Sequence, residues 1–335
     1  MTQRPDSSPR LTLAVAFACL LCSAPGHAQG LQQCARIADG AARLACYDRL
    51  AADAAGGRLE ATPVAAARAP TADTGALGAR RRHESNQLDN PFGLTAYKPN
   101  YILPVTYNSK IHEEPWTSIY PDAQMDDIEA KFQISIKAKL WEIGDRLGLW
   151  AAYTQESWWQ VFNDDESAPF RETNYQPEAF LSYDTQMELL GFRIAQLTLA
   201  FNHQSNGRSE PLSRSWNRII GGALIERGNL AISPRVWYRI PEDEEDDDNP
   251  DTEDYYGYGD LRFAYTWHDM TFSALGRNNL QSDDNRGALQ LDWSFPLNRR
   301  FKGYVQYFHG YGESLIDYDV KTNRIGLGVM LTDWL

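Results

Sequence analysis

The stretch AKFQISIKAKL, residues 130–140, decides the fold. Apolar and polar side chains alternate at every position along it. The apolar positions are Ala130, Phe132, Ile134, Ile136, Ala138 and Leu140, and the polar ones are Lys131, Gln133, Ser135, Lys137 and Lys139. A period of two residues is that of a β-strand whose two faces meet different surroundings. Three lysines on one face are too much charge for the core of a soluble sandwich, so the pattern favours a strand between lipid and water.

The same alternation recurs along the chain after residue 90. Strands of about 9–11 residues suffice to cross a bilayer, and bacterial single-chain barrels have an even number of strands. Twelve segments are expected to be strands: 98–108, 129–141, 148–161, 175–184, 192–204, 217–226, 229–239, 255–267, 269–279, 287–295, 301–309 and 323–334. The sequence therefore predicts an all-β fold, a transmembrane antiparallel β-barrel of twelve strands over residues 88–335.

The connections between these segments alternate in length. The tight ones are EIGDRLG, ERGN, HD and PLNRR, and the long ones are 109–128, 162–174, 205–216, 240–254, 280–286 and 310–322. Short periplasmic turns and long outer loops are typical of outer-membrane barrels. Odd-numbered segments then run outward, so the fifth segment, 192–204, ends at the outer surface.

Composition and charge agree with this class. Aromatic residues make up 12% of the chain, with 10 tryptophans, and membrane barrels use such residues for their interfacial girdles. The net charge of −13 owes much to an acidic run, residues 242–254. It argues against a nucleic-acid partner. The acidic run itself is expected to be a solvated outer loop, with calcium binding as the alternative.

The N-terminus has the features of an exported protein. Residues 1–28 predict a signal peptide, with an apolar run, Leu11–Cys22, that is too short to span a membrane. Residues 29–53 form a separate, helical-looking segment, and an Ala/Pro-rich linker is expected over 54–87. Cys34 and Cys46 are expected to form a disulfide in an oxidising compartment, and two free thiols are the alternative.

Chemistry is expected at the outer end of the fifth segment. One face of that segment carries Ala195, Leu197, Leu199 and Phe201. His203 and Ser205 continue the same face, so both should point toward lipid. An imidazole two residues from a hydroxyl can remove its proton during nucleophilic attack. Asn217 opens the next segment and can orient the imidazole through its amide oxygen. The plain alternative is a polar boundary at a strand end.

The loop after Ser205 offers groups for an oxyanion and a cation. The backbone amide of Gly207 can donate to an oxyanion. The hydroxyls of Ser209, Ser213 and Ser215, the carbonyl of Arg208 and the loop around Ser167 offer the oxygens that Ca²⁺ prefers.

Several long motifs resemble outer-membrane phospholipase A. They are NHQSNGRS (202–209), SRSWNR (213–218), YTQESWWQ (153–160), SAPFRETNYQP (167–177), GYGESLIDY (310–318) and GVMLTDWL (328–335). The resemblance covers about residues 88 to 335. It implies a calcium-dependent barrel of the outer membrane that hydrolyses acyl esters of phospholipids, of the phospholipase A1/A2 and lysophospholipase type.

The resemblance also implies roles for individual residues. His203, Ser205 and Asn217 match the family's triad. Calcium is held across the interface of an active homodimer, and the matching groups are the Arg208 carbonyl and Ser213 from one chain and Ser167 from its partner. Gln155 matches a polar residue of the dimer interface.

Some features depart from the family, and other functions stay open. The chain ends in Trp334-Leu335, where the family usually has Phe, and the cysteine-bearing segment and the acidic run lie outside the shared pattern. A non-enzymatic porin or adhesin barrel would need neither an outward His–Ser pair nor a serine-rich return loop. An outer-membrane protease would need carboxylates above the barrel mouth, which only the acidic run offers.

Overall fold

The computed structural model describes residues 34–56 except 38, residues 75–84 except 79 and 83, and residues 93–333 except 244 and 299. The predicted signal peptide, most of the predicted linker and the terminal Trp334-Leu335 lie outside the described residues. The chain divides into two compact units, residues 1–71 and 72–335. Each unit is described by itself.

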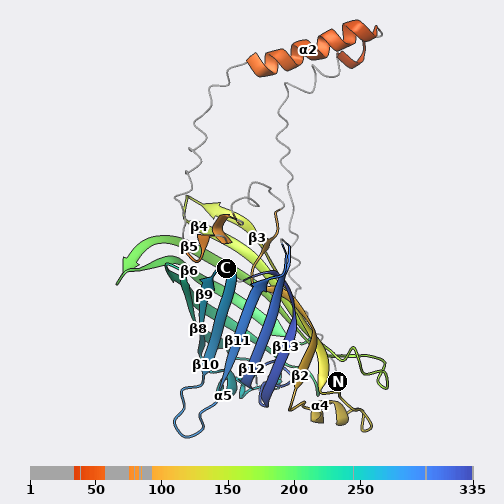
Figure 1. Ribbon diagram of the computed structural model, residues 1–335, viewed down its shortest axis with the longest axis vertical. Coiled ribbons are helices and arrows are strands. Elements are labelled where there is room, and N and C mark those ends of the chain that lie inside the picture. Colours follow the sequence, from red (N-terminus) through yellow and green to blue (C-terminus); the bar gives the residue numbers. More distant parts are fainter. Residues whose placement is uncertain are drawn as a thin grey trace, which may run out of the picture. The chain divides into compact units, whose positions relative to one another are not determined.

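The second unit is the predicted barrel of twelve antiparallel strands (Figure 1). The strands are β2 (Asn100–Asn108), β3 (Ile128–Ile143), β4 (Leu147–Trp159), β5 (Phe170–Leu189), β6 (Phe192–Ser205), β7 (Ser215–Arg227), β8 (Leu230–Ile240), β9 (Gly259–Trp267), β10 (Met270–Asn278), β11 (Gly287–Pro296), β12 (Lys302–Tyr311) and β13 (Lys321–Thr332). Each pairs with its neighbours in sequence, and β13 pairs with β2 to close the ring. A two-residue strand, β1 (Thr95–Ala96), adds to β3. No helix in the described part of the chain is long and apolar enough to cross a membrane.

The strands expose their apolar face and bury their polar face, which confirms the alternation read from β3. Ile134 is 50% exposed, whereas Ser135 is fully buried and Lys137 is 5% exposed. The same holds on β6, where Leu199 is 55% exposed and Asn202 is 1% exposed. This is the arrangement of a barrel in lipid, since the outer surface meets hydrocarbon and the interior is polar.

Paired charges close the interior at the end that carries the long loops. The Arg171 guanidinium bonds the Glu129 carboxylate at 3.0 Å and the Asp317 carboxylate at 2.7 Å. Arg324 joins the same cluster through Glu129 at 2.7 Å, and all four side chains are buried. Because each charge has an opposite partner, the network can fill the interior without leaving an uncompensated ion.

The long connections lie at one end, where Figure 1 shows two short helices. These are α4 (Glu114–Thr117) and α5 (Thr252–Tyr256). The expected strand at 255–267 was wrong at its start, because α5 occupies residues 255 and 256. Gly257 ends this helix with a φ of 67°, and β9 begins only at Gly259.

A bulge corrects the predicted face of Ala195. The pairing of β6 with β7 shifts register between Ile194 and Gln196. Ala195 is only 4% exposed and packs in a buried cluster with Leu77, rather than facing outward with Leu197. A bulge inserts one residue into a strand and so reverses the alternation beyond it.

The end of the segment expected to be a linker packs against the barrel. Leu77 is fully buried, and its amide donates to the Glu226 carboxylate at 3.0 Å. The Ala76 amide donates to the carbonyl of Gly228, in the tight turn between β7 and β8, at 2.8 Å. Alanine-rich composition is typical of linkers, but small side chains also fit a narrow space beside a turn.

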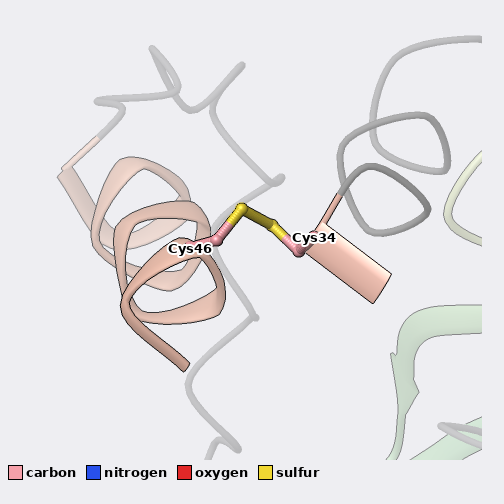
Figure 2. The surroundings of a disulfide bond; sticks show 2 residues. All are labelled: Cys34 and Cys46. Atoms are coloured by element: carbon pink, nitrogen blue, oxygen red, sulfur yellow. A yellow bond between two sulfur atoms is a disulfide. The ribbon is translucent and has the colours of Figure 1, made fainter. Parts of the chain in front are cut away.

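The first unit contains α2 (Gly40–Gly56) and a disulfide (Figure 2). Cys46 on this helix is bonded to Cys34, with their Cα atoms 5.5 Å apart. The bridge ties the helix to the short helical turn that precedes it.

Candidate active site

His203 and Ser205 lie at the end of β6 that leads into a long loop, on the strand face that also carries Phe201. Phe201, two residues earlier, is 46% exposed, while Asn202 and Gln204 are buried in the interior. His203 and Ser205 are partly exposed. The bulge at Ala195 lies below this end of β6, so the alternation from Leu197 to Ser205 is unbroken.

Asn217 lies directly opposite His203 on β7. The His203 Nδ1 and Asn217 Oδ1 atoms are 2.9 Å apart. An amide oxygen can only accept, so Nδ1 of a neutral His203 carries the proton and Nε2 is left as an acceptor. Residues two apart on one strand lie about 6–7 Å apart at the backbone, a spacing at which an imidazole can reach a serine hydroxyl.

Hydrogen bonds on the interior side hold the two strands behind this pair. The Gln204 amide oxygen accepts from the Trp216 indole at 3.0 Å and from the Arg218 guanidinium at 3.0 Å. Arg218 also donates to the Asn202 amide oxygen at 2.7 Å. Because these residues alternate with His203, Ser205 and Asn217, the backbone beneath the outward side chains is fixed.

Asn206, which the sequence analysis did not single out, organises the loop between β6 and β7. Its side-chain oxygen accepts from the Arg208 amide at 3.3 Å and the Arg214 amide at 3.0 Å. Its side-chain nitrogen donates to the Leu212 carbonyl at 2.8 Å. The residue is 4% exposed. An Asn directly after a strand, before a Gly, is the available sequence signal, since Asn side chains commonly bond the backbone of turns.

Gly207 occupies a position that favours glycine. Its φ is 66°, and a Cβ placed there would lie 3.1 Å from the Tyr175 ring. Gly207 follows Ser205 by two residues, at a bend of the backbone. Its amide is the expected donor to an oxyanion.

Part of the acidic run 242–254 contacts this site, while Asp243, Glu245 and Asp246 are exposed, so the expectation of a solvated loop is only partly correct. The Asn217 side-chain nitrogen donates to Glu242 Oε1 at 2.8 Å. The Ser213 hydroxyl donates to the Asp248 carboxylate, and the Ser215 amide donates to Asn249 Oδ1 at 2.9 Å. Carboxylates in a charge run usually face water, but here polar groups at the start of β7 offer them donors.

The expected calcium ligands are hydroxyl and carbonyl oxygens on two loops. Ser213 and Arg208 lie in the loop after β6, and Ser167 is an exposed residue with a φ of 60° in the loop between β4 and β5. The Arg208 side chain donates hydrogen bonds to the carbonyls of Phe170 and Arg171. Among the residues that the structure describes, no three His, Cys, Asp or Glu side chains form a metal-binding group.

Gln155 is a polar residue on the lipid-facing side of β4. The neighbouring Tyr153 on that face is 36% exposed. The Gln155 amide nitrogen donates to the Ser157 hydroxyl at 3.2 Å, and the Tyr153 hydroxyl donates to the Gln155 oxygen at 3.3 Å. A polar group among exposed apolar side chains is costly in hydrocarbon unless it is paired.

His112 and Asp317 form a contact between two of the long loops. His112, in the loop between β2 and β3, has its Nδ1 3.4 Å from the carboxylate of Asp317, in the loop between β12 and β13. The interaction with this carboxylate raises the pKa of His112 above its usual value of 6.5.

Comparison with known proteins gives consistent matches. The phospholipase A1 family matches residues 77–331. Phospholipase A1 of Klebsiella pneumoniae is 40% identical over 247 residues, which are 73% of this chain and 84% of that protein.

Two solved structures are also similar. The Salmonella typhi outer membrane phospholipase dimer with bound calcium has a TM-score of 0.69 and 38% identity, covering 73% of this chain and 94% of that one. An asparagine-to-alanine active site mutant of Escherichia coli outer membrane phospholipase A has a TM-score of 0.70 and 39% identity, covering 76% of this chain and 98% of that one. With a family match over most of its length and relatives at this identity, the chain belongs to the phospholipase A1 family.

Proposed function

We propose that this phospholipase uses Ser205 as nucleophile, His203 as general base and then acid, and Asn217 to orient the imidazole. The observation that carries the proposal is the 2.9 Å contact between His203 Nδ1 and Asn217 Oδ1, beside a serine on the same outward face. The E. coli relative has an active-site asparagine, and Asn217 is the matching candidate here.

The reaction is hydrolysis of an acyl ester of a phospholipid. The Ser205 hydroxyl oxygen attacks the ester carbonyl carbon while its proton moves to His203 Nε2. The bond between the carbonyl carbon and the glycerol oxygen then breaks, and that oxygen takes the proton from His203 and leaves with the lysophospholipid. Water next attacks the acyl-serine and gives a proton to His203. The second collapse releases the fatty acid and returns a proton to Ser205.

Charge that develops on the carbonyl oxygen needs donors or a cation. The Gly207 amide is the donor on the described chain. Calcium, when bound, supplies positive charge beside the oxyanion. The donors fit this hard ion, since all are oxygens and the Ser213 hydroxyl already faces the Asp248 carboxylate. The Arg208 carbonyl and Ser213 of one chain would hold calcium together with Ser167 of the partner subunit.

The active form is proposed to be a homodimer. The S. typhi relative is a dimer with bound calcium. On this chain the Gln155 amide lies on the lipid-facing side of β4, where a second copy can pair it. An enzyme embedded in its substrate needs such a restraint, because the monomer would lack one calcium ligand.

The location follows from the fold and the relatives. The barrel places this chain in the outer membrane. The site lies at the end that carries the long loops, and long loops of such barrels are extracellular. The proposed substrates are therefore phospholipids that reach the outer leaflet.

The interior argues against a porin. The network of Arg171, Glu129, Asp317 and Arg324 fills the end with the long loops. A cavity of about 230 Å³ remains inside the barrel, lined by Lys98, Glu156 and Arg235 among others, away from the His–Ser pair. We assign it no part in catalysis, since lipid does not reach the barrel interior.

The test is fatty-acid release from phospholipid in mixed micelles by the refolded protein, with calcium and with chelator. Ser205→Ala should lower kcat by about 10³-fold or more, because it removes the nucleophile. Unboiled gel mobility controls for an intact barrel. Hydrolysis that survives in Ser205→Ala would refute the triad, and no hydrolysis by the dimeric wild type in calcium would favour an adhesin.

A further inference from the structure

The Asn217 amide is held at both ends. Its oxygen lies 2.9 Å from His203 Nδ1, and its nitrogen donates to Glu242 Oε1 at 2.8 Å. Glu242 is partly buried at the start of the acidic run. The series of hydrogen bonds from His203 through Asn217 to Glu242 therefore ends in a carboxylate.

This carboxylate fixes which way the amide faces. An amide presents an acceptor on one side and a donor on the other, in nearly the same shape. A carboxylate only accepts, so it demands the NH₂ group and turns the oxygen toward His203. In the opposite orientation the amide would present its NH₂ group to Nδ1, and the imidazole would be driven into the tautomer that cannot take the Ser205 proton.

The carboxylate also supplies the charge that a neutral asparagine lacks. An acceptor oxygen becomes stronger when the other end of its group donates to an anion, because hydrogen bonds in a chain polarise one another. Imidazolium formed on His203 is then stabilised through Asn217. In a Ser-His-Asp triad the acid touches the imidazole directly, whereas here one amide stands between them.

The loop that carries Glu242 is held in place by other contacts. The Arg239 guanidinium donates to the Asp247 carboxylate at 2.6 Å and to the Pro250 carbonyl at 2.9 Å. Asn249 is 1% exposed and accepts from the Ser215 amide at 2.9 Å. The loop that carries Glu242 is therefore ordered by its own hydrogen bonds, and these hold Glu242 beside Asn217.

From these contacts we propose that Glu242 is a positioning residue of the catalytic machinery, which sets the orientation and strength of the Asn217 amide. This role rests on the proposed triad. It predicts an effect on the chemical step and none on calcium or substrate binding.

The experiment compares Glu242→Ala, which removes both the acceptor and the charge, with Glu242→Gln, which keeps an acceptor and removes the charge. Matched controls are Glu245→Ala and Glu245→Gln, at an exposed position of the same loop. The full-length protein is refolded, and kcat and KM are measured in phospholipid mixed micelles over a calcium titration. The rate at which a long-chain sulfonyl fluoride modifies Ser205 is followed by intact mass, as a direct readout of nucleophile activation.

Glu242→Ala is expected to lower kcat by about 10- to 100-fold, the range for a hydrogen bond to a charged group. KM and the calcium concentration for half-activation should stay within about twofold, and sulfonylation should slow in parallel with kcat. Glu242→Gln should lose less than Glu242→Ala. If Glu242→Ala fails to fold by gel mobility, Glu242→Gln against Glu245→Gln still tests the charge.

Three results would overturn the assignment: kcat equal to that of the Glu245 controls, a loss confined to KM, or a loss restored by more calcium. A failure of the triad itself looks different. In that case Ser205→Ala would keep activity or would still react with the sulfonyl fluoride, whatever the Glu242 variants do.

Discussion

The Asn217 amide, which we propose orients His203, has a different partner at each end. The residue is neutral, and so it gives an imidazolium less support than a carboxylate would. Its oxygen faces His203 Nδ1 at 2.9 Å, and its nitrogen faces Glu242 Oε1 at 2.8 Å. Two contacts of ordinary length therefore set the His203 tautomer that the proposed proton transfer from Ser205 requires.

Gly207 offers a second test at a single residue. Gly207→Ala should lower kcat by about 10- to 100-fold, because the oxyanion donor is displaced. The φ of 66° costs a side chain about 1–2 kcal/mol, and the new Cβ would meet Tyr175 at 3.1 Å. Hydrolysis is measured as above.

Gly144→Ala is the matched control for this change. Gly144 has a φ of 63° with nothing within 4 Å of a Cβ, in the tight turn between β3 and β4. It carries the same backbone cost far from the site, so its kcat should be unchanged. Equal activity of the two alanine variants would remove Gly207 from the oxyanion site.

Among the elements, β6 shows what alternation fixes and where it fails. Leu197, Leu199 and Phe201 face outward as the pattern predicts, and His203 and Ser205 continue that face. Ala195 faces inward because a bulge separates it from this run. The end of β6 that carries His203 and Ser205 was therefore predictable, while its other end was not.

Two of the long loops are joined by a contact that is expected to respond to pH, between His112 and Asp317. The Asp317 carboxylate raises the pKa of His112 above 6.5. A raised pKa in the folded state means that the stabilisation is present at low pH and is lost as pH rises through the folded value. The contact between the two loops should therefore weaken at alkaline pH.

The measurement is the thermal midpoint of wild type and of His112→Gln at about pH 5.5 and about pH 8.5. From the lower to the higher pH, the thermal midpoint of the wild type should fall by more than that of His112→Gln. Other titrating groups act on both proteins equally, so the difference reports this contact. An identical pH dependence would show that the ion pair contributes nothing to the loops.

At the scale of the whole molecule, the barrel exposes its apolar residues and buries its charges. Leu327 is 60% exposed, whereas Arg324 is 2% exposed on the same strand. This arrangement is stable only in lipid, so the enzyme lies within its own substrate. We propose that assembly, rather than access to the bilayer, controls its activity.

Dimerisation is the assembly step to test. Gln155→Ala should weaken the calcium-dependent dimer by about tenfold, because hydrogen bonds between membrane segments contribute about 1–2 kcal/mol. Analytical ultracentrifugation in detergent with calcium measures the dimer. Phe272→Ala is the control, since Phe272 is exposed on β10, across the ring from β4. A dimer that tolerates Gln155→Ala as well as it tolerates the control would place the interface elsewhere.

The barrel, its twelve strands and the outward face of His203 and Ser205 could be predicted without the structure. These follow from a period of two residues and from loop lengths, which are local properties that each strand carries alone. The meeting of His203 with Asn217 was also predictable, because consecutive antiparallel strands joined by one loop bring their near ends together.

Features that depend on distant parts of the chain became visible only in the folded protein. The composition of the acidic run predicts a solvated loop. In the folded protein, however, Glu242 contacts Asn217 and Asp248 contacts Ser213. The inward turn of Ala195 and the burial of Leu77 depend on each other across more than a hundred residues. Composition does not distinguish an acidic loop in water from one whose carboxylates accept hydrogen bonds from the protein. The partner of a side chain is set by packing and not by its neighbours in sequence.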